Sequence, residues 1–334
     1  MAPTPSLEEI GGRESLLGSR FVGMMRAGAA TSAVGVAVGA ATVGLAHVES
    51  RFPTVRNGEV PIRAREGFHE LRILQISDLH MFEGQEFIGD FLARVAEEEQ
   101  FDFVVSTGDN LSDHSGVPLL LEALEPLMQY PGAFVLGSND YYLPKRKPWI
   151  SYLDPTHHKE ASERVSYMNP ELPWFDVVQQ MVKSGWIDMS NRSVATTIPT
   201  PDGDLPVALV GVDDPHIRRD RFPKPVTQWD DPGAVRLALS HSPYKRVLDR
   251  ATELGSDLIL TGHTHGGQVR LPGFGAIVNN CDIPNKYSRG LYPWVYEGKR
   301  SWVNISAGLG TSRFAQIRFF CRPEVSLITL KASN

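Results

Sequence analysis

The stretch Leu71–His80, LRILQISDLH, joins a short apolar run to an Asp-x-His pair. Its first part, Leu71–Ser77, has the length of a strand and is rich in Leu and Ile, as expected for a strand buried on both faces. Alternate residues of an extended chain point to the same side, so Asp78 and His80 are able to reach one ion together. The sequence therefore predicts a strand with two metal-ligand side chains at its carboxyl end.

Similar apolar runs recur along the chain and predict further buried strands. They are Phe103–Thr107, Ala133–Leu136, Val207–Val212, Val235–Leu239 and Asp257–Leu260. Apolar residues at helical spacing lie between them and predict helices at Phe87–Val95, at Trp174–Met181 after Pro173, and at Val247–Leu254 before Gly255. Strands that alternate with helices predict an α/β fold, with any site at the carboxyl ends of the strands.

Polar residues follow four of these runs, as Asp78 and His80 follow the first. The segments are Gly108-Asp109-Asn110, Gly137-Ser138-Asn139-Asp140, Ser240-His241-Ser242 and Gly262-His263-Thr264-His265-Gly266-Gly267. Carboxylate, amide and imidazole ligands together suit Mn, Fe or Zn, and the set is too rich in nitrogen for Ca. Seven such ligands with one shared carboxylate are about the number that two ions need.

The order Asp-x-His, Gly-Asp, Asn, His, Gly-His-x-His resembles that of the calcineurin-like metallophosphoesterases, over residues 70–331. The resemblance implies an αββα architecture, a two-sheet β-sandwich flanked by helices. It implies two divalent ions, with Mn preferred and Fe or Zn as alternatives, and a hydroxide between them that attacks phosphorus in line. The ligands it implies are Asp78, His80 and His265 for one ion, Asn139, His241 and His263 for the other, and Asp109 as the bridge.

Further segments resemble a bacterial, membrane- or wall-associated phosphodiesterase branch of that family, and they are Gly211–Pro215, Gly262–Gln268, Gly308–Ser312 and Arg322–Glu324. That branch includes manganese-dependent phosphodiesterases and enzymes that cleave the pyrophosphate of nucleotide-linked lipid A precursors. The resemblance implies hydrolysis of a phosphodiester or pyrophosphate in a lipid-linked or cell-envelope substrate, such as a UDP-diacylglucosamine-like nucleotide lipid. The alternatives are a phosphomonoesterase or protein phosphatase, and a metal-binding envelope protein that is catalytically silent.

The chain departs from the family pattern at Asp140, where the family usually has a His directly after the Asn ligand. A carboxylate near two cations should be ionised and a poor acid. Three interpretations follow: the leaving group needs little acid help, another residue supplies it, or the activity has lapsed. His114 is one candidate substitute, with a solvated loop histidine as the alternative. Asn110 is predicted to bind phosphate oxygens, or else only to cap a turn.

The N-terminal part differs in composition from the rest. Residues 1–26 are polar, and no charged residue occurs from Ala27 to Ala46, so residues 27–47 are predicted as a transmembrane or signal-anchor helix. A signal-peptidase site at Gly44-Leu45-Ala46, or a glycine-rich helix packed on the protein, are the alternatives. We therefore expect a membrane-associated protein, on an undecided side of the membrane, with an exported or a cytoplasmic protein as alternatives.

Residues 48–69 contain turn signals and are predicted as a connector before the 70–331 domain. Residues 141–170 are predicted as an inserted cap loop. Its basic cluster Lys145-Arg146-Lys147 is expected either to meet an anionic headgroup or membrane surface, or to be a solvated loop.

The bulk composition narrows the class of partner. The 334 residues carry a formal net charge of −6, so there is no general basic field and nucleic acid is not expected as a partner. Cys281 and Cys321 are the two cysteines, and their separation fits neither a disulfide scaffold nor a zinc-ribbon spacing. The expected partner is a phosphate-ester substrate.

Overall fold

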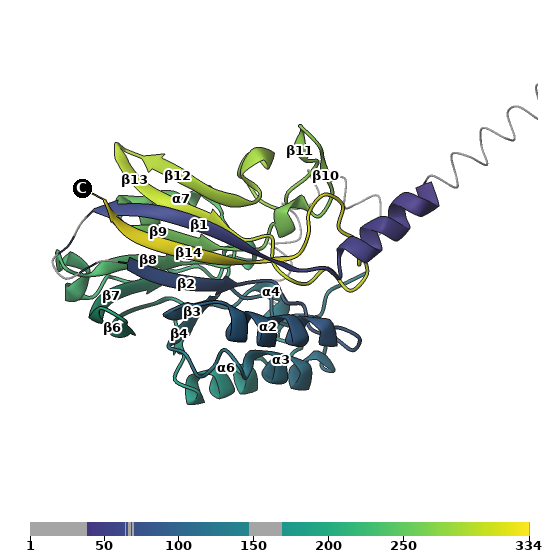
Figure 1. The fold of residues 1–334 in the computed structure, drawn as a ribbon, viewed down its shortest axis with the longest axis horizontal. Helices are drawn as coiled ribbons and strands as arrows, with labels where there is room; N and C mark the ends of the chain where they lie inside the picture. Colours follow the sequence, from purple (N-terminus) through teal and green to yellow (C-terminus); the bar gives the residue numbers. More distant parts are fainter. Residues whose placement is uncertain (1–38, 64, 66–67, 69, 147–168, 334) are drawn as a thin grey trace, which may run out of the picture. The chain divides into compact units, whose positions relative to one another are not determined.

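The computed structural model describes residues 39–63, 65, 68, 70–146 and 169–333 (Figure 1). The chain divides into two units, Met1–Ala46 and His47–Asn334. In the first unit, residues 39–46 are helical. Among the helices that the structure describes, none has both the length and the apolar character needed to cross a membrane. Residues 27–38 of the predicted membrane helix and 147–168 of the predicted cap loop lie outside the described residues.

The second unit contains two six-stranded sheets. The first has, in order, β1 (Thr54–Arg63), β14 (Glu324–Ser333), β2 (Glu70–Ile76), β3 (Phe103–Ser106), β4 (Gly132–Phe134) and β5 (Ile187–Asp188). The second has, in order, β12 (Gly290–Tyr296), β13 (Lys299–Ile305), β9 (Leu258–Thr261), β8 (Val235–Leu239), β7 (Gly203–Gly211) and β6 (Arg192–Thr200). A small hairpin pairs β10 (Arg270–Leu271) with β11 (Gly275–Ala276).

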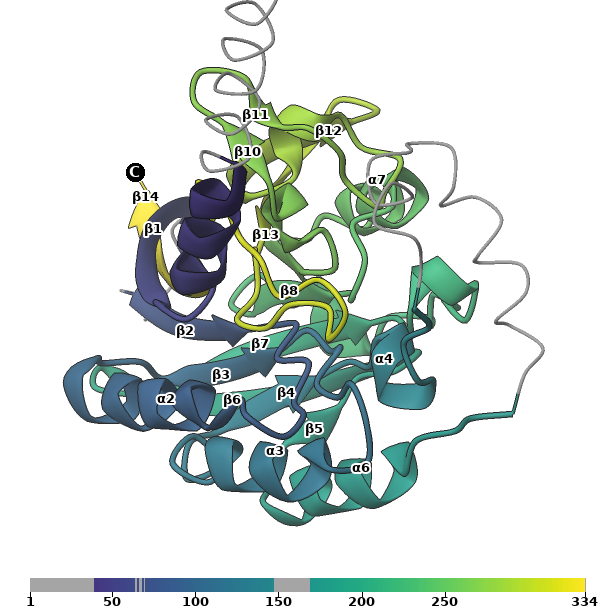
Figure 2. The same ribbon diagram turned by 90° about the vertical axis from the view of Figure 1, so that its right-hand side faces the viewer.

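Parallel strands form the middle of each sheet. In the first sheet β2, β3, β4 and β5 run parallel, and in the second β7, β8, β9 and β13 do. The sheets lie face to face (Figures 1 and 2), and apolar side chains from both fill the space between them, among them Ile73, Val105, Leu209, Leu237 and Leu260. The predicted buried runs therefore pack as a sandwich core.

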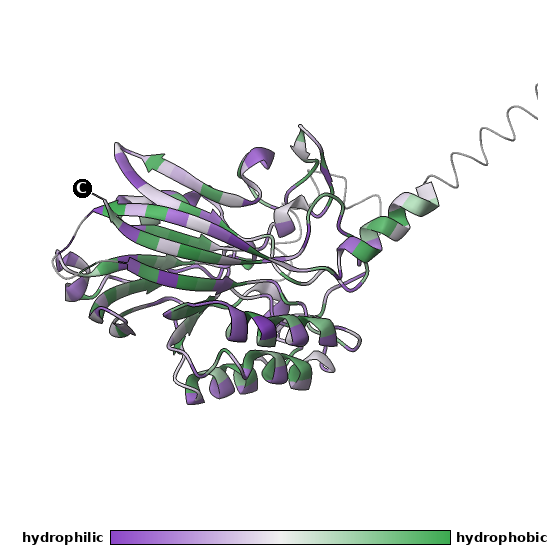
Figure 3. Cartoon of the chain, in the orientation of Figure 1, coloured by the Kyte–Doolittle hydropathy of each residue, from purple (hydrophilic) through white to green (hydrophobic). Residues whose placement is uncertain are grey.

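Helices flank the sandwich on both outer sides. The helices α2 (Glu86–Glu98), α3 (Gly116–Leu124) and α6 (Trp174–Lys183) cover the first sheet (Figure 1), and α7 (Lys245–Glu253) packs on the second. Each helix turns an apolar face inward and a polar face outward (Figure 3). The predicted α/β fold of two sheets flanked by helices is confirmed, and the three predicted helices correspond to α2, α6 and α7.

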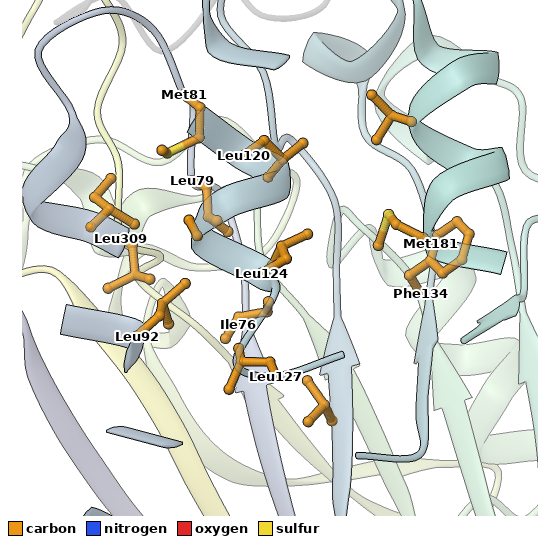
Figure 4. Close-up of a cluster of buried hydrophobic side chains, with 14 of the residues drawn as sticks. Ile76, Leu79, Met81, Leu92, Leu120, Leu124, Leu127, Phe134, Met181 and Leu309 are labelled. Carbon is orange, nitrogen blue, oxygen red and sulfur yellow. The ribbon is translucent and has the colours of Figure 1, made fainter. Parts of the chain in front are cut away.

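The segment that carries the Asp-x-His pair alternates between two environments. Leu79 and Met81 are fully buried and pack against Leu120 and Leu124 of α3 (Figure 4). His80 lies between them and does not join this apolar cluster. Burial of its two neighbours thus helps to direct the His80 side chain away from the core and toward the edge of the sheets.

The predicted connector at 48–69 contains β1, which pairs in parallel with β14 at the edge of the first sheet. Asn57-Gly58 and Pro61, which indicated turns in the sequence, lie inside this strand. An edge position tolerates Pro61 because one side of the strand makes no ladder hydrogen bonds.

Candidate metal centre

The predicted ligands all follow parallel strands at their carboxyl ends. Asp78 and His80 follow β2, Asp109 follows β3, and Asn139 lies in the short helix α4 (Ser138–Tyr141) after β4. In the second sheet the ligands are His241 after β8, and His263 and His265 after β9. The edge of a parallel sheet where strands end is where open α/β folds place their sites.

Two groups of three side chains converge there. In the first, Nε2 of His265 lies 3.0 Å from Nε2 of His80 and 3.5 Å from Oδ1 of Asp78. In the second, Nε2 of His241 lies 3.3 Å from Oδ2 of Asp109 and 3.2 Å from Nδ1 of His263. Within each group, one ligand atom from every residue lies within 4.8 Å of the others.

Asp109 connects the two groups. Its Oδ2 atom lies 3.3 Å from His241 Nε2 in the second group and 3.7 Å from His80 Nε2 in the first. The side-chain amide of Asn139 donates to the same oxygen at 2.7 Å, and the Asn139 backbone N–H donates to Oδ1 at 2.8 Å. One carboxylate thus faces both groups, which is the geometry that a bridging ligand requires.

The donor set fits two divalent ions. Imidazole and carboxylate donors are the ligands that Mn, Fe and Zn share, and here they are almost completely buried. Burial lowers the pKa of His80, His263 and His265, which favours the neutral imidazole that ligates metals. Against the cost of burial, the charge of His241 and its hydrogen bond hold the pKa of Asp109 well below its ordinary value, so its carboxylate stays charged.

The backbone at the ligands is strained. Asp78, His80, Asp109, His263 and His265 have φ angles of 50°, 48°, 56°, 68° and 49°, in the left-handed region that residues other than glycine rarely adopt. Strain of this kind persists where the surrounding structure compensates for it, and it is concentrated at functional sites. Its concentration at five predicted ligands indicates that the fold is organised around this centre.

Two glycines leave room for the ligands. A Cβ at Gly262 would collide with the Ser77 hydroxyl and with Oδ2 of Asp78. A Cβ at Gly137 would collide with Oδ1 of Asp109. Glycine at these two positions is therefore a packing requirement of the carboxylates beside it.

Asp140 faces the backbone. Its Oδ2 accepts the N–H groups of Gly137 and Asp109 at 2.8 and 2.9 Å, and its Oδ1 accepts the N–H of Asn110 at 2.9 Å. The residue is 1% exposed, and burial followed by the charge of Asp109 raises its pKa to about 6. A catalytic role for Asp140 stays a prediction, and its contacts are those of a group that fixes the loop around Asp109.

Asn110 and His114 occupy very different environments. Asn110 is fully buried; its Oδ1 accepts from the Ser106 hydroxyl at 3.3 Å, and its Nδ2 has no hydrogen-bond partner among the described residues. The amide of Asn110, the residue after Asp109, thus has a donor without a partner among the described residues, and its contact with a phosphate oxygen stays a prediction. His114 is exposed on the turn before α3, and within the described chain neither metal group includes it.

A histidine that the sequence analysis did not select also lies at this centre. The ring centroid of His216 is 4.4 Å from that of His263, and its Nδ1 lies 3.0 Å from the Tyr244 hydroxyl. His216 belongs to the 3₁₀ helix η2 (Pro215–Ile217), which follows β7. The sequence pattern could have indicated this histidine, because the segment Asp213–His216 comes directly after the apolar run 207–212 and so lies at another strand end.

Known proteins are similar to this chain in sequence. A calcineurin-like phosphoesterase family profile matches residues 71–267, more than half of the chain. The uncharacterized metallophosphoesterase YkuE of Bacillus subtilis is 24% identical over 290 residues, which cover 86% of this chain and 87% of that protein. The UDP-2,3-diacylglucosamine pyrophosphatase LpxG of Chlamydia trachomatis is 26% identical over 290 residues, which cover 78% and 83%.

Phosphodiesterase YaeI of Escherichia coli is 33% identical over 139 residues, which cover 41% of this chain and 45% of that protein. Among solved structures, a dimetal phosphatase from Danio rerio is similar with a TM-score of 0.39 at 11% identity, over 80% of this chain and 100% of that one. The family match covers all seven predicted ligands, which are the six residues of the two groups, Asp109 among them, and Asn139. The chain belongs to the calcineurin-like phosphoesterase family, and it is a metallophosphoesterase in which the residues of the dimetal site are intact.

Proposed function

We propose that the protein hydrolyses a phosphodiester or pyrophosphate bond whose leaving group has a low pKa, in a lipid-linked substrate. The observation that carries this proposal is the state of Asp140. Its two oxygens accept three backbone N–H groups, so no proton donor stands directly after Asn139. Loss of general acid help costs a factor of about 10²–10⁴. The loss of rate is smallest for leaving groups that are stable as anions, such as the phosphate half of a pyrophosphate.

The residues of the centre have separate roles in binding the ions and the substrate. When bound, two divalent ions supply an activated water and neutralise charge on the phosphoryl oxygens. Asp109 would hold both ions, and the surrounding fold keeps the other ligands in their left-handed backbone conformations before substrate arrives. The buried amide of Asn110 would donate to a phosphoryl oxygen.

Exposed apolar side chains near the centre support a substrate with acyl chains. Leu271, Phe274 and Phe320 are 44%, 72% and 56% exposed, and we call them the apolar rim. Backbone hydrogen bonding joins the β10–β11 hairpin to the residue before Phe320. Cys321, the residue after Phe320, donates a hydrogen bond from its thiol to the backbone carbonyl of His265 at 3.4 Å. The rim therefore adjoins a predicted ligand. Acyl chains lying on these side chains would remove them from water.

The names of relatives support the same substrate classes. LpxG is named a UDP-2,3-diacylglucosamine pyrophosphatase and YaeI a phosphodiesterase. We propose in addition that the protein belongs to the membrane- or wall-associated branch of the family and that it associates with a membrane. The uncharged segment from Ala27 to Ala46 supports them.

The test compares substrates on the purified, manganese-loaded chain. We expect higher kcat/KM for bis-p-nitrophenyl phosphate than for p-nitrophenyl phosphate, and turnover of a UDP-diacylglucosamine-like pyrophosphate. Faster cleavage of the monoester would favour a phosphomonoesterase instead. Two bound ions without turnover of any activated diester would favour the catalytically silent alternative.

Variants of the apolar rim test its role in binding the lipid part of the substrate. Phe274→Ser and Phe320→Ser should lower kcat/KM on the lipid-linked pyrophosphate by about tenfold and leave the water-soluble diester unchanged, because each removes about one aromatic side chain of apolar contact. Phe175→Ser is the matched control, since Phe175 is 54% exposed on α6. An equal effect of all three variants on both substrates would contradict a role for the rim.

A further inference from the structure

We propose that Ser77 is a positioning residue for the ion of the first group, because its hydroxyl holds one oxygen of Asp78 and thereby turns the other toward that ion. Behind Ser77 lies a buried series of hydrogen-bonded side chains that begins in the second sheet. We call this series the polar relay, and it consists of Asn304, Gln75, Thr107 and Ser77. The inference concerns metal binding and does not depend on the substrate proposed above, so the two can fail separately.

The polar relay crosses the sandwich core at a glutamine inside an apolar strand. Along β2 the side chains of Leu71 and Ile73 point into the core between the sheets, and Gln75 continues this alternation. A buried amide is costly there unless its polar atoms find partners. Its Nε2 donates to the Thr261 carbonyl of β9 at 2.8 Å, and its Oε1 accepts from the Asn304 side chain of β13 at 2.8 Å. Gln75 therefore joins the two sheets close to the strand ends that carry the predicted ligands.

The direction of the hydrogen bonds follows from groups that only accept. A main-chain carbonyl is an acceptor only, so the Gln75 amide turns its nitrogen toward the carbonyl of β9. The same nitrogen lies 3.3 Å from the Thr107 hydroxyl, which donates to the Ser77 hydroxyl at 2.6 Å and has a more distant acceptor, the Ile76 carbonyl, at 3.5 Å. The Ser77 hydroxyl donates to Oδ2 of Asp78 at 2.5 Å. Each hydroxyl thus accepts one hydrogen bond and donates the next, and such a series is cooperative.

The relay determines which oxygen of Asp78 the protein itself occupies. Oδ2 accepts from Ser77 and, at 3.0 Å, from the backbone N–H of His263, which also lies 3.1 Å from Oδ1. Oδ1 lies 3.5 Å from Nε2 of His265 and 4.0 Å from Nε2 of His80. Asp78 and the four side chains of the relay are at most 2% exposed, so bulk water does not compete for these hydrogen bonds. Oδ1 is therefore the oxygen that faces the other two ligands of the first group.

The relay has a different contact with the second group. Nδ1 of His241 lies 2.7 Å from the main-chain carbonyl of Thr107, and a change of the Thr107 side chain leaves that carbonyl in place. Loss of a relay hydroxyl should therefore weaken the first group and spare the second. This difference separates orientation of Asp78 from a general effect on stability.

The experiment measures Mn²⁺ binding by calorimetry in two backgrounds of the full chain, each of which keeps one group of ligands intact. His263→Ala leaves the first group, and His265→Ala leaves the second. Adding Ser77→Ala to the first background should weaken Mn²⁺ binding by about 10- to 100-fold, as for loss of other groups that orient a metal ligand. Adding Ser77→Ala to the second background should leave the affinity unchanged.

Substitutions of Thr107 test the relay without changing Ser77 or Asp78. Thr107→Val keeps nearly the shape of threonine but neither donates nor accepts, so it should cause a smaller loss of affinity in the first background. Thr107→Ser keeps the hydroxyl and should restore most of that affinity. Ser256→Ala is the control, because it removes a buried hydroxyl that donates to the Ala251 carbonyl, and it should change neither background.

Three results would overturn the proposal. An unchanged affinity of Ser77→Ala in the first background would remove its role, and an equal loss in both backgrounds would make that role a general structural one. A Thr107→Ser variant that binds as weakly as Thr107→Val would make the contribution of Thr107 one of packing. The Thr107 pair decides alone if urea unfolding shows that Ser77→Ala does not fold. A chain that shows the expected binding but hydrolyses nothing would contradict only the proposed function.

Discussion

The carboxylate of Asp140 accepts the backbone N–H of Asp109, the residue whose own carboxylate faces both groups of ligands. The same carboxylate also accepts the backbone N–H groups of Gly137 and Asn110. Asp109 has a φ of 56°, which costs free energy unless neighbouring contacts hold it. A buried acceptor of three N–H groups provides that support, so Asp140 has a structural role next to Asp109, the predicted bridge.

Asp140→Asn should therefore weaken both stability and metal binding. The amide cannot accept all three N–H groups, and a buried donor left unpaired costs about 1–3 kcal/mol. We expect a lower free energy of unfolding by about that amount, measured in urea, and weaker Mn²⁺ binding by calorimetry. Asp90→Asn is the control, because Asp90 is exposed on α2. Full stability and full Mn²⁺ affinity in Asp140→Asn would refute the structural role.

Gly262→Ala should disturb the first group of ligands. The added methyl group would meet the Ser77 hydroxyl and the Asp78 carboxylate, and overpacking at a buried position costs about 1–3 kcal/mol. We expect reduced manganese content by elemental analysis and reduced turnover. Gly89→Ala in α2 is the matched control, because its methyl group would find Ala123 at an ordinary contact distance of 3.5 Å. Similar metal content in the two variants would contradict the packing argument.

Histidine variants should separate the two ions. His265→Ala removes a ligand of the first group and His263→Ala a ligand of the second, so each should retain about half of the wild-type manganese content. Turnover should fall by about a thousandfold or more, because each ion supplies several kcal/mol of transition-state stabilisation. A variant that keeps the wild-type metal content and rate would show that its histidine is not a ligand.

Asp214 should make the metal-free protein sensitive to pH. Burial, with the charge of Asp109 as a further cause, raises its pKa from 3.8 to about 7, while His241 acts in the opposite direction. The folded protein thus binds this proton more tightly than the unfolded chain does. The resulting stabilisation is complete below about pH 4 and is lost as the pH rises through about 7.

Asp214→Asn removes this titration, because an amide stays neutral throughout. In chelator, the unfolding free energy of the wild type relative to this variant should fall by about 3 kcal/mol from pH 4 to pH 7. The measurement is urea unfolding of both proteins across that range. A difference that does not change with pH would contradict the raised pKa.

The buried parallel strands could be predicted from the sequence because they lie in the middle of the sheets. Strands such as β2 and β9 are covered on both faces, so they read as continuous apolar runs. The ligands could be predicted for the same reason, since every such run ends at the edge where the site forms. The structure places six of them in two groups and Asn139 against Asp109.

The outer strands could not be predicted by that reasoning. In β12 and β13, exposed and half-exposed residues interrupt the apolar ones, and Pro293 lies inside β12. β1 contains turn residues and depends on pairing with β14, which is about 270 residues away in sequence, a contact that no local pattern reveals. The role of Asp140 was equally hidden, because its three backbone partners belong to two different loops.

The most direct test of the central claim is hydrolysis of bis-p-nitrophenyl phosphate while Mn²⁺ is titrated into the metal-free protein. If two ions held by the groups around Asp109 carry the reaction, the rate should rise until about two ions are bound per chain and then level off. Asp109→Ala should show no such rise. Full activity with one ion bound, or no activity with two ions bound, would contradict a binuclear phosphoesterase that cleaves diesters.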